Sequence, residues 1–366
     1  MTLPMKRALV VFLITSAIGV IAVSIMARTA WRYGDTVGGI AQGRVPVEIP
    51  QGASALDVAT RLQEAGLIGN PTVFRLYAGQ RGVAGRFKAG RYEIAAPATP
   101  KQILDTLVKG AADELVTVVI PPGKHLLEVA EILDAAGVAG KAELVAKASD
   151  PLFAAELGLP GNTLEGYLFP DTYRLRPRTT PARALIPLVR RHRQVWGELR
   201  AAHVKAAGEL KKTLGFDDHK IVILASIVEK ETGRAEERPR IAQVFINRLR
   251  FPTFVPKLLQ TDPTIIYGCT VATQKSAACQ KWDGRIHRIH LDDRDNPYNT
   301  YTNLGLPPGP ISNPGRAALE AVLAPDQTPY LYFVARNDGT HQFSRTVAEH
   351  NAAVVKFQRG GKALSQ

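Results

Sequence analysis

Signature motifs of three large enzyme classes are absent from this sequence of 366 residues. It contains no P-loop for nucleotide phosphates, no glycine fingerprint for dinucleotides and no Gly-x-Ser-x-Gly turn for a nucleophilic serine. Each of these motifs places backbone or side-chain groups where its chemistry needs them. Their absence therefore argues against phosphoryl transfer, hydride transfer and serine hydrolysis.

Cysteine is scarce as well. The only two, Cys269 and Cys279, lie in "GCTVATQKSAACQKW". A structural zinc site would need further ligands at suitable spacing, and none is evident. Two interpretations remain open: a disulfide that closes a short loop in an oxidising compartment, or two unpaired thiols.

Acidic residues are outnumbered by basic ones, which gives a formal net charge of +13. Such a surplus attracts anionic polymers and surfaces, so nucleic acid, acidic lipid and bacterial cell wall are all candidate partners. No zinc knuckle, RNP sequence or recognition helix accompanies the charge, and we therefore expect no nucleic-acid partner.

Charge is missing from one long run near the start, "ALVVFLITSAIGVIAVSIMA" (8–27). Its length suits a single membrane-spanning helix. A cleaved signal peptide is the alternative, but its apolar region would usually be shorter and no clean cleavage site follows. We favour an uncleaved anchor. Basic residues flank both ends, so the positive-inside rule does not decide its orientation.

A repeat follows the Gly-rich segment 32–44, which we interpret as a linker. "VEIPQGASALDVATRLQEAG" (47–66) aligns at constant offset with "VVIPPGKHLLEVAEILDAAG" (118–137). Each copy predicts a short strand, a Pro-Gly turn and an amphipathic helix closed by glycine. "FKAGRYEIAAPATPKQIL" (87–104) and "LEGYLFPDTYRLRPRTTPARAL" (164–185) then each predict a strand that carries a tyrosine and a helix that starts at Thr-Pro. The fold class is therefore α+β, with two related modules.

The segment "HKIVILASIVEKETG" (219–233) predicts a strongly apolar helix, yet it ends in Glu229 and Glu231. Both acids fall among apolar positions on a helical wheel, which does not distinguish them. A desolvated carboxyl keeps its proton to higher pH and can donate it to a leaving oxygen. The alternative is an ordinary helix end, with a glutamate paired to Lys230 or Arg234.

Further along, carboxylates, amides and aromatic rings recur in four short strings, "EGYLFPDTY", "INRL", "LQTD" and "NPYNTY". Sugar-binding sites use this mixture, although each such residue alone is more often a capping or turn residue. The candidate binding residues are Glu165, Tyr167, Asp171, Tyr173, Glu231, Asn247, Arg248, Gln260, Asp262, Tyr298, Asn299 and Tyr301. The string "HRIHLDDRDNP" (287–297) has metal-ligating residue types, but mixed Arg and Asp favour a solvated loop, and we expect no metal and no cofactor.

The sequence resembles the YceG-like family of endolytic murein transglycosylases (MltG type) at seven strings that occur in family order. They are "EGYLFPDTY" (165–173), "LASIVEKET" (224–232), "FINRL" (245–249), "LQTDPTIIYG" (259–268), "PYNTY" (297–301), "GLPPGPI" (305–311) and "FSRTVAEHN" (343–351). Two departures stand out. Residues 269–281 look like an insertion, and Asp-Asn precedes "PYNTY" where Asp-Ser is expected.

This resemblance implies a single-pass protein of the bacterial inner membrane with a periplasmic catalytic domain. It also implies a LysM-like module, a mixed α/β catalytic domain and peptidoglycan glycan strands as substrate, with peptidoglycan synthases or elongation machinery as candidate partners. The family's catalytic acid falls on Glu229, which leaves Glu231 a supporting role. The expected parts are a cytoplasmic tip and anchor (1–30), a linker (31–44), a LysM-like module (45–112), a catalytic domain (113–358, with a second module in 113–215) and a tail (359–366).

The implied reaction is cleavage of the bond between N-acetylmuramic acid and N-acetylglucosamine without water, which leaves 1,6-anhydro ends within nascent strands and ends their elongation. Substrate-assisted glycosidases show that a second carboxylate is not obligatory. Two alternatives remain: a membrane-tethered scaffold that binds peptidoglycan without turnover, and ordinary hydrolysis.

Overall fold

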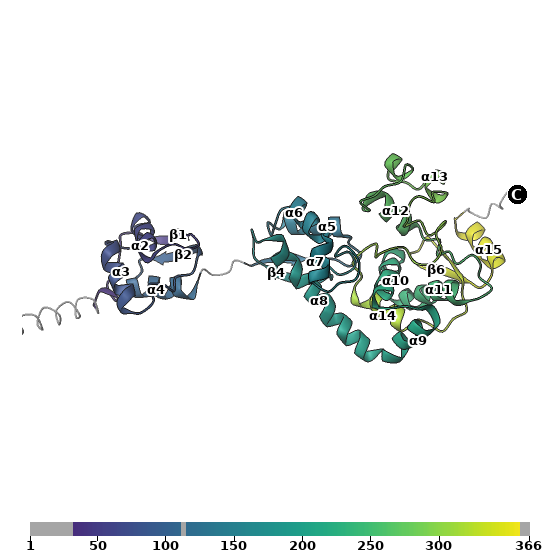
Figure 1. Ribbon diagram of the computed structural model, residues 1–366, viewed down its shortest axis with the longest axis horizontal. Helices are drawn as coiled ribbons and strands as arrows, with labels where there is room; N and C mark the ends of the chain where they lie inside the picture. The colour runs from purple at the N-terminus through teal and green to yellow at the C-terminus, as the bar shows by residue number, and fades with distance from the viewer. Residues whose placement is uncertain (1–31, 111–114, 359–366) are drawn as a thin grey trace, which may run out of the picture. The chain divides into compact units, whose positions relative to one another are not determined.

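The computed structural model of this chain describes residues 32–110 and 115–358 and falls into two compact units that divide near residue 113 (Figure 1). The predicted membrane-spanning segment, residues 8–27, lies outside the described residues. Among those that are described, no helix combines the length and apolar character that crossing a bilayer requires.

The first unit is a small α+β module around one antiparallel strand pair. Its elements are β1 (Gly43–Ile49), α2 (Ala55–Glu64), α3 (Pro71–Gln80), β2 (Gly90–Ala96) and α4 (Pro100–Lys109). Val47 lies opposite Tyr92 in the strand pair, and both side chains enter the module's core. Residues from the predicted linker also pack here, since Gly38 donates to the Ala98 carbonyl and Ala41 to that of Gly66.

The second unit opens with the same arrangement. Its first elements are β3 (Val116–Val119), α5 (Leu126–Ala135), α6 (Lys141–Ala148), α7 (Pro151–Glu156), β4 (Thr172–Leu175) and α8 (Pro181–Ala202). Val118 lies opposite Tyr173, as Val47 lies opposite Tyr92, so the two strand pairs share one register. The predicted repeat is thus confirmed, together with its helices that start at Thr-Pro.

Glycine closes the predicted turns of both copies. Gly52 and Gly123, which end the two Pro-Gly turns, have φ of 80° and 78°. Gly66 and Gly137, which follow the two helices, have φ of 71° and 70°. This left-handed region is costly for other residues, which explains why glycine recurs at the same repeat positions.

The remaining elements of the second unit surround α10. They are α9 (Val204–Leu214), α10 (Asp218–Glu231), η1 (Ala235–Glu237), α11 (Arg238–Arg250), α12 (Asp262–Thr270), η2 (Cys279–Lys281), α13 (Arg288–Leu291), α14 (Arg316–Leu323), β5 (Tyr332–Ala335), β6 (His341–Ser344) and α15 (Val347–Gln358). The helix predicted within 219–233 is confirmed as α10. The family string 259–268 contains most of α12, which has Pro263 in its first turn.

Two large hydrophobic clusters form most of the core of this unit. One lies within the second module and the other among α10, α11 and α14. The long helix α8 belongs to both, because Leu185 and Leu188 pack in the module cluster while Val195 and Leu199 pack in the α10 cluster. Figure 1 shows α8 running from the α5–α7 region toward α9 and α14.

The two cysteines form a disulfide, which decides between the two interpretations left open by the sequence. The bond joins the last turn of α12 to η2 and closes the segment that looked like an insertion. Both cysteines are buried in a small cluster with Ile265. The insertion is therefore fastened to α12.

Candidate active site

A pocket of about 220 Å³ lies where the C-terminal end of α10 meets the turn between β3 and α5. The residues that line it are Pro122, Gly123, Lys124, Glu229, Lys230, Glu231, Thr232 and Gly233. One wall thus comes from the second module and the other from α10. The predicted catalytic residue, Glu229, lies in this pocket.

The sequence of α10 explains why Glu229 sits at the edge of a core. Asp217 caps the helix by accepting the Lys220 N–H at 2.8 Å. Residues 221–228 are then all buried, which is the run of apolar and small residues seen in the sequence. Glu229 is the first residue after this run, and its side chain is only 4% exposed although it lines the pocket.

Both carboxylate oxygens of Glu229 accept a hydrogen bond. Arg238 at the start of α11 donates from Nη2 to Oε1 at 2.9 Å, and the Gly315 N–H donates to Oε2 at 2.9 Å. The setting of Glu229 is therefore charged and hydrogen-bonded, in contrast to the apolar wall predicted. Neither Lys230 nor Arg234 is the ion-pair partner, since they contact the carbonyls of Gly123 and Gly339 instead.

Gly315 approaches Glu229 so closely that a larger residue would crowd the site. It precedes α14, so the positive end of that helix faces the carboxylate. A Cβ at Gly315 would lie 3.4 Å from Glu229 Oε2 and 3.3 Å from Pro122 Cβ. Glycine therefore allows the backbone N–H to reach the acid while the opposite wall stays close.

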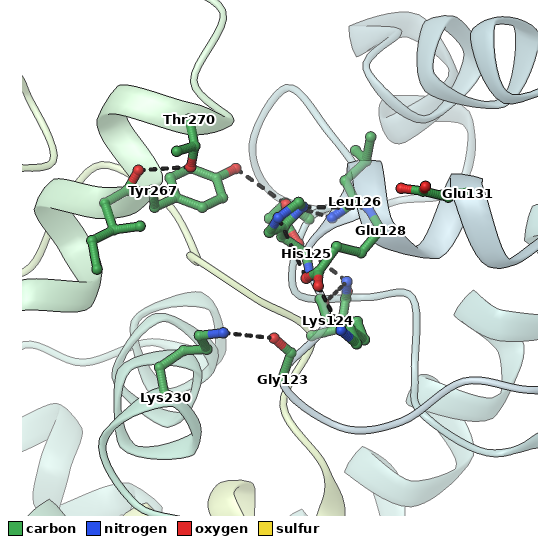
Figure 2. Close-up of polar contacts among 12 residues, drawn as sticks. Gly123, Lys124, His125, Leu126, Glu128, Glu131, Lys230, Tyr267 and Thr270 are labelled. Carbon is green, nitrogen blue, oxygen red and sulfur yellow. Dashed lines mark hydrogen bonds and ion pairs between the residues drawn. The ribbon is translucent and has the colours of Figure 1, made fainter. Parts of the chain in front are cut away.

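The opposite wall is the Pro-Gly turn of the second repeat. A Cβ on Gly123 would lie 3.5 Å from Glu229 Cγ, whereas one on Gly52, its counterpart in the first module, would meet nothing within 4 Å. Figure 2 shows the Lys230 ammonium directed at the Gly123 carbonyl, with an Nζ–O distance of 3.4 Å. The second copy of the repeat has thus become part of the pocket.

Asn313 fixes this turn against the acid. It is fully buried, and its backbone and Nδ2 both donate to the Lys124 carbonyl at 2.9 Å. Its carbonyl accepts the Gly123 N–H at 3.0 Å, and its Oδ1 accepts the Leu168 N–H at 2.8 Å. Because Gly315 follows two residues later, one short segment holds both walls of the pocket.

Glu165 lies behind the pocket and is 2% exposed. It accepts hydrogen bonds from the Leu126 N–H at 2.9 Å, Tyr267 Oη at 3.2 Å and Asn313 Nδ2 at 3.1 Å. Figure 2 shows the Tyr267 hydroxyl pointing toward the start of α5. Burial raises the pKa of Glu165 to about 8, against the opposing effect of the backbone donor and Tyr267.

A protonated Glu165 has a consequence for stability. Its pKa is about 8 in the folded chain, above the ordinary value of 4.5. Between these values the folded state binds more protons than the unfolded state, so the stability that Glu165 contributes is present at low pH and is lost as pH rises through 8. We expect the free energy of unfolding to fall between pH 5 and 9 by roughly 3–5 kcal/mol from this group.

Denaturant unfolding of wild type and Glu165→Gln at both pH values checks this. Glutamine imitates the neutral acid, so the variant should show a flatter pH dependence. Glu131→Gln, which alters an exposed glutamate paired with Lys141, is the matched control and should keep the wild-type slope. An equal slope in Glu165→Gln would contradict the assignment.

Glu231 occupies a different environment from Glu229. The Thr261 hydroxyl donates to its Oε1, and burial raises the pKa of the Glu231 carboxyl. Arg248 lies nearby, and burial lowers its pKa to about 10 although Glu231 acts in the opposite direction. Two carboxyl groups in one pocket thus have different partners, a cation for Glu229 and a hydroxyl for Glu231.

Comparisons with known proteins show the family of this chain. A family model described as the YceG-like family matches residues 47–356. The chain belongs to the YceG-like family. It is 32% identical over 327 residues to the "Endolytic murein transglycosylase" of Bacillus subtilis (strain 168), which spans 86% of this chain and 84% of that relative. The pneumococcal (Streptococcus pneumoniae serotype 2) protein of the same name is 29% identical over 342 residues, 85% of this chain and 58% of its own.

A crystal structure of a YceG-like protein from Listeria monocytogenes resembles this chain at a TM-score of 0.54 and 32% identity. The match covers 86% of this chain and 100% of that chain. Together with the strands and helices above, it supports the predicted mixed α+β fold as a YceG-like fold. The residues of the seven family strings can therefore be located in this fold.

Several family-string residues prove to be internal. Tyr167, Tyr173, Asn247, Arg248 and Asn299 are all buried, with polar atoms that contact neighbouring groups of the chain. Tyr167 Oη lies 2.7 Å from His219 Nδ1, and Tyr173 donates to the Phe169 carbonyl at 2.6 Å. Asn299 donates to three carbonyls of the loop before it. These residues lie outside the pocket, and their hydrogen bonds stabilise the structure around it.

Other predicted binding residues lie outside the pocket as well. Asp171 accepts from Arg191 Nε at 2.7 Å, and Tyr301 donates to Asp262 Oδ1 at 2.6 Å. The Tyr298 ring packs on Tyr267 with centroids 4.8 Å apart. Gln260 is exposed with φ of 51°. Of the predicted set, only Glu229 and Glu231 line the pocket.

The sequence interpretation missed Arg238, Asn313, Gly315 and the turn at Gly123. The turn had a signal, since it is the Pro-Gly of the second repeat. Asn313 and Gly315 lie in "ISNPG", directly after the family string "GLPPGPI", but small polar residues there look like any loop. Among the described residues, no group of His, Cys, Asp and Glu could hold a metal ion.

Proposed function

We propose that this chain is an endolytic murein transglycosylase that cleaves the β-1,4 bond between N-acetylmuramic acid and N-acetylglucosamine, with Glu229 as its catalytic acid and base. The observation that carries the proposal is a glutamate with a 4% exposed side chain that still lines a pocket, in a chain whose relatives are named for that activity. A glutamate so placed can meet a substrate while bulk water is kept from most of its surface.

In the proposed reaction, protonated Glu229 donates its proton to the bridging oxygen as the bond from C1 of the muramic sugar to that oxygen breaks. The N-acetyl group of the same sugar stabilises the positive charge at C1. Glu229 then accepts the proton of the C6 hydroxyl, and the C6 oxygen closes onto C1. Water is not consumed, and a 1,6-anhydro end results.

The contacts of Glu229 support this double role. Arg238 and the Gly315 N–H together stabilise the carboxylate that forms once the proton has left. A protonated carboxyl group donates one hydrogen bond and keeps lone pairs that accept others, so Glu229 can hold its proton beside these two donors. Glu231, held by Thr261, supports the same pocket.

The location follows from the same proposal. We propose that residues 8–27 anchor the chain in the inner membrane, with the catalytic unit in the periplasm. The disulfide between Cys269 and Cys279 supports this, because such bonds persist in oxidising compartments. The first module is proposed to be LysM-like and to bind peptidoglycan, and peptidoglycan synthases remain candidate partners.

Product analysis tests the proposal. Full-length chain purified in detergent is incubated with peptidoglycan, and the products are examined by mass spectrometry. We expect fragments from within strands that carry 1,6-anhydro ends. Ends heavier by one water would mean hydrolysis, and binding without new ends would mean a scaffold.

A further inference from the structure

Lys230 has no carboxylate partner among the residues that the structure describes, unlike Lys124, the other lysine that lines the pocket. Glu229 is paired with Arg238 at 2.9 Å, and Lys124 with Glu128 at 2.6 Å. The Lys230 ammonium contacts the Gly123 carbonyl alone, at 3.4 Å, which is longer than an ordinary hydrogen bond. A positive charge in the pocket is thus left for another ligand.

The position of this ammonium is close to the reacting group. Lys230 follows Glu229 on α10, and its Nζ lies at the carbonyl of Gly123, the residue that faces Glu229 across the pocket. Figure 2 shows Lys230 reaching toward the turn that also bears Lys124. An anion bound by Lys230 would therefore lie beside the glycosidic bond whose oxygen Glu229 is proposed to protonate.

The contact with Gly123 is not needed to hold the turn. The Gly123 N–H already donates to the Asn313 carbonyl at 3.0 Å, and the Lys124 carbonyl accepts two bonds from Asn313 at 2.9 Å. These are shorter than the Lys230 contact, and Asn313 is fully buried. Lys230 itself is exposed, so it can exchange the carbonyl for a ligand.

The substrate class of the proposed function offers a matching anion. The sugar rings of murein carry no charge, and the carboxylates of a strand belong to the stem peptides on the lactyl groups of the muramic sugars. The stem at the cleaved bond starts on the same sugar whose C1 reacts. We propose that Lys230 binds a carboxylate of this stem peptide and makes the enzyme select glycan that bears peptides.

The inference rests on the proposed function, so the experiment separates the two. Full-length chain is given three soluble, uncrosslinked strands: one with stem peptides, one whose stem carboxylates are converted to amides, and one stripped of stems by an amidase, with the lactyl carboxylates that this exposes also converted to amides. We expect wild type to have a kcat/KM at least ~10-fold higher on the first than on either other strand, as a charged hydrogen bond provides.

Lys230→Met should bring these ratios close to one, and Lys230→Arg should restore most of the preference because it keeps the charge. Lys220→Met alters an exposed lysine of the same helix that donates to the Gly215 carbonyl, and should retain the wild-type ratios. If Lys230→Met lowers kcat/KM equally on all three strands, Lys230 has a structural role only and the inference is wrong.

A binding measurement tests the role of Lys230 without any cleavage of the strand. Kd values for the three strands are measured by fluorescence on the Glu229→Gln background, with and without Lys230→Met. A preference for peptide-bearing strands that disappears with the lysine supports the inference, and equal Kd ratios overturn it. Wild type that cleaves none of the strands refutes the proposed function alone.

Discussion

Glu229→Gln is expected to lower the rate of glycan cleavage by at least ~100-fold and up to ~10,000-fold, the range that a positioned acid or base contributes. Glutamine has almost the same shape but has no proton to donate to the bridging oxygen and cannot act as a base. It can still accept the Gly315 N–H, so the pocket should keep its form. The loss should appear in kcat, because the proton moves only in the reacting complex.

The measurement is the release of anhydro-muropeptides from purified strands. Glu236→Gln is the matched control, since Glu236 is exposed, lies outside the pocket and pairs with Arg234. It should act at the wild-type rate. Glu229→Asp keeps the acid but shortens its reach and should fall between the two. Wild-type product formation by a folded Glu229→Gln chain would rule out the assignment.

Asn313→Ala is expected to destabilise the second unit by roughly 3 kcal/mol or more and to reduce activity in the chains that remain folded. The change removes every side-chain bond of a fully buried residue. It leaves the Leu168 N–H without the Oδ1 acceptor and Glu165 Oε1 without the Nδ2 donor. Unsatisfied buried groups cost about 1–3 kcal/mol each.

Thermal unfolding and kinetics together test this effect. Ser312→Ala is the control, because this neighbour is equally buried but its side chain donates one bond, to the Ser226 carbonyl at 3.1 Å. It should cost only about 1 kcal/mol. At a temperature where both variants are folded, Asn313→Ala should have the lower kcat, since the turn at Gly123 and Lys124 loses the bond from Asn313 Nδ2 to the Lys124 carbonyl. Equal kcat values would show that Asn313 supports stability only.

Much of the fold could be predicted because its signals are local. The Pro-Gly turns, the glycines at positive φ and the Thr-Pro helix starts each constrain a few consecutive residues, and the repeat shows them twice. Helix α12 has no such local signal. It is short, flanked by turn residues and stabilised by packing and by the disulfide at Cys269, none of which a local pattern reveals.

The site was less predictable because its contacts are long-range. The helical pattern placed Glu229 at the end of a buried run, but the family resemblance was needed to prefer it to Glu231. Its partner Arg238 lies beyond a chain reversal, and Gly315 lies 86 residues away. The sequence has many arginines and glycines, and no local pattern identifies Arg238 and Gly315 as the hydrogen-bond donors of Glu229.

Helix α8 has a consequence for remote substitutions. Its first half is embedded in the cluster behind the Gly123 turn and its second half in the cluster behind Glu229. Helix α8 therefore connects the packing behind the two walls of the pocket without contributing a residue to it. We expect substitutions that disturb α8 in either cluster to change the spacing between Glu229 and the Gly123 turn, and so to impair catalysis while every pocket residue is unchanged.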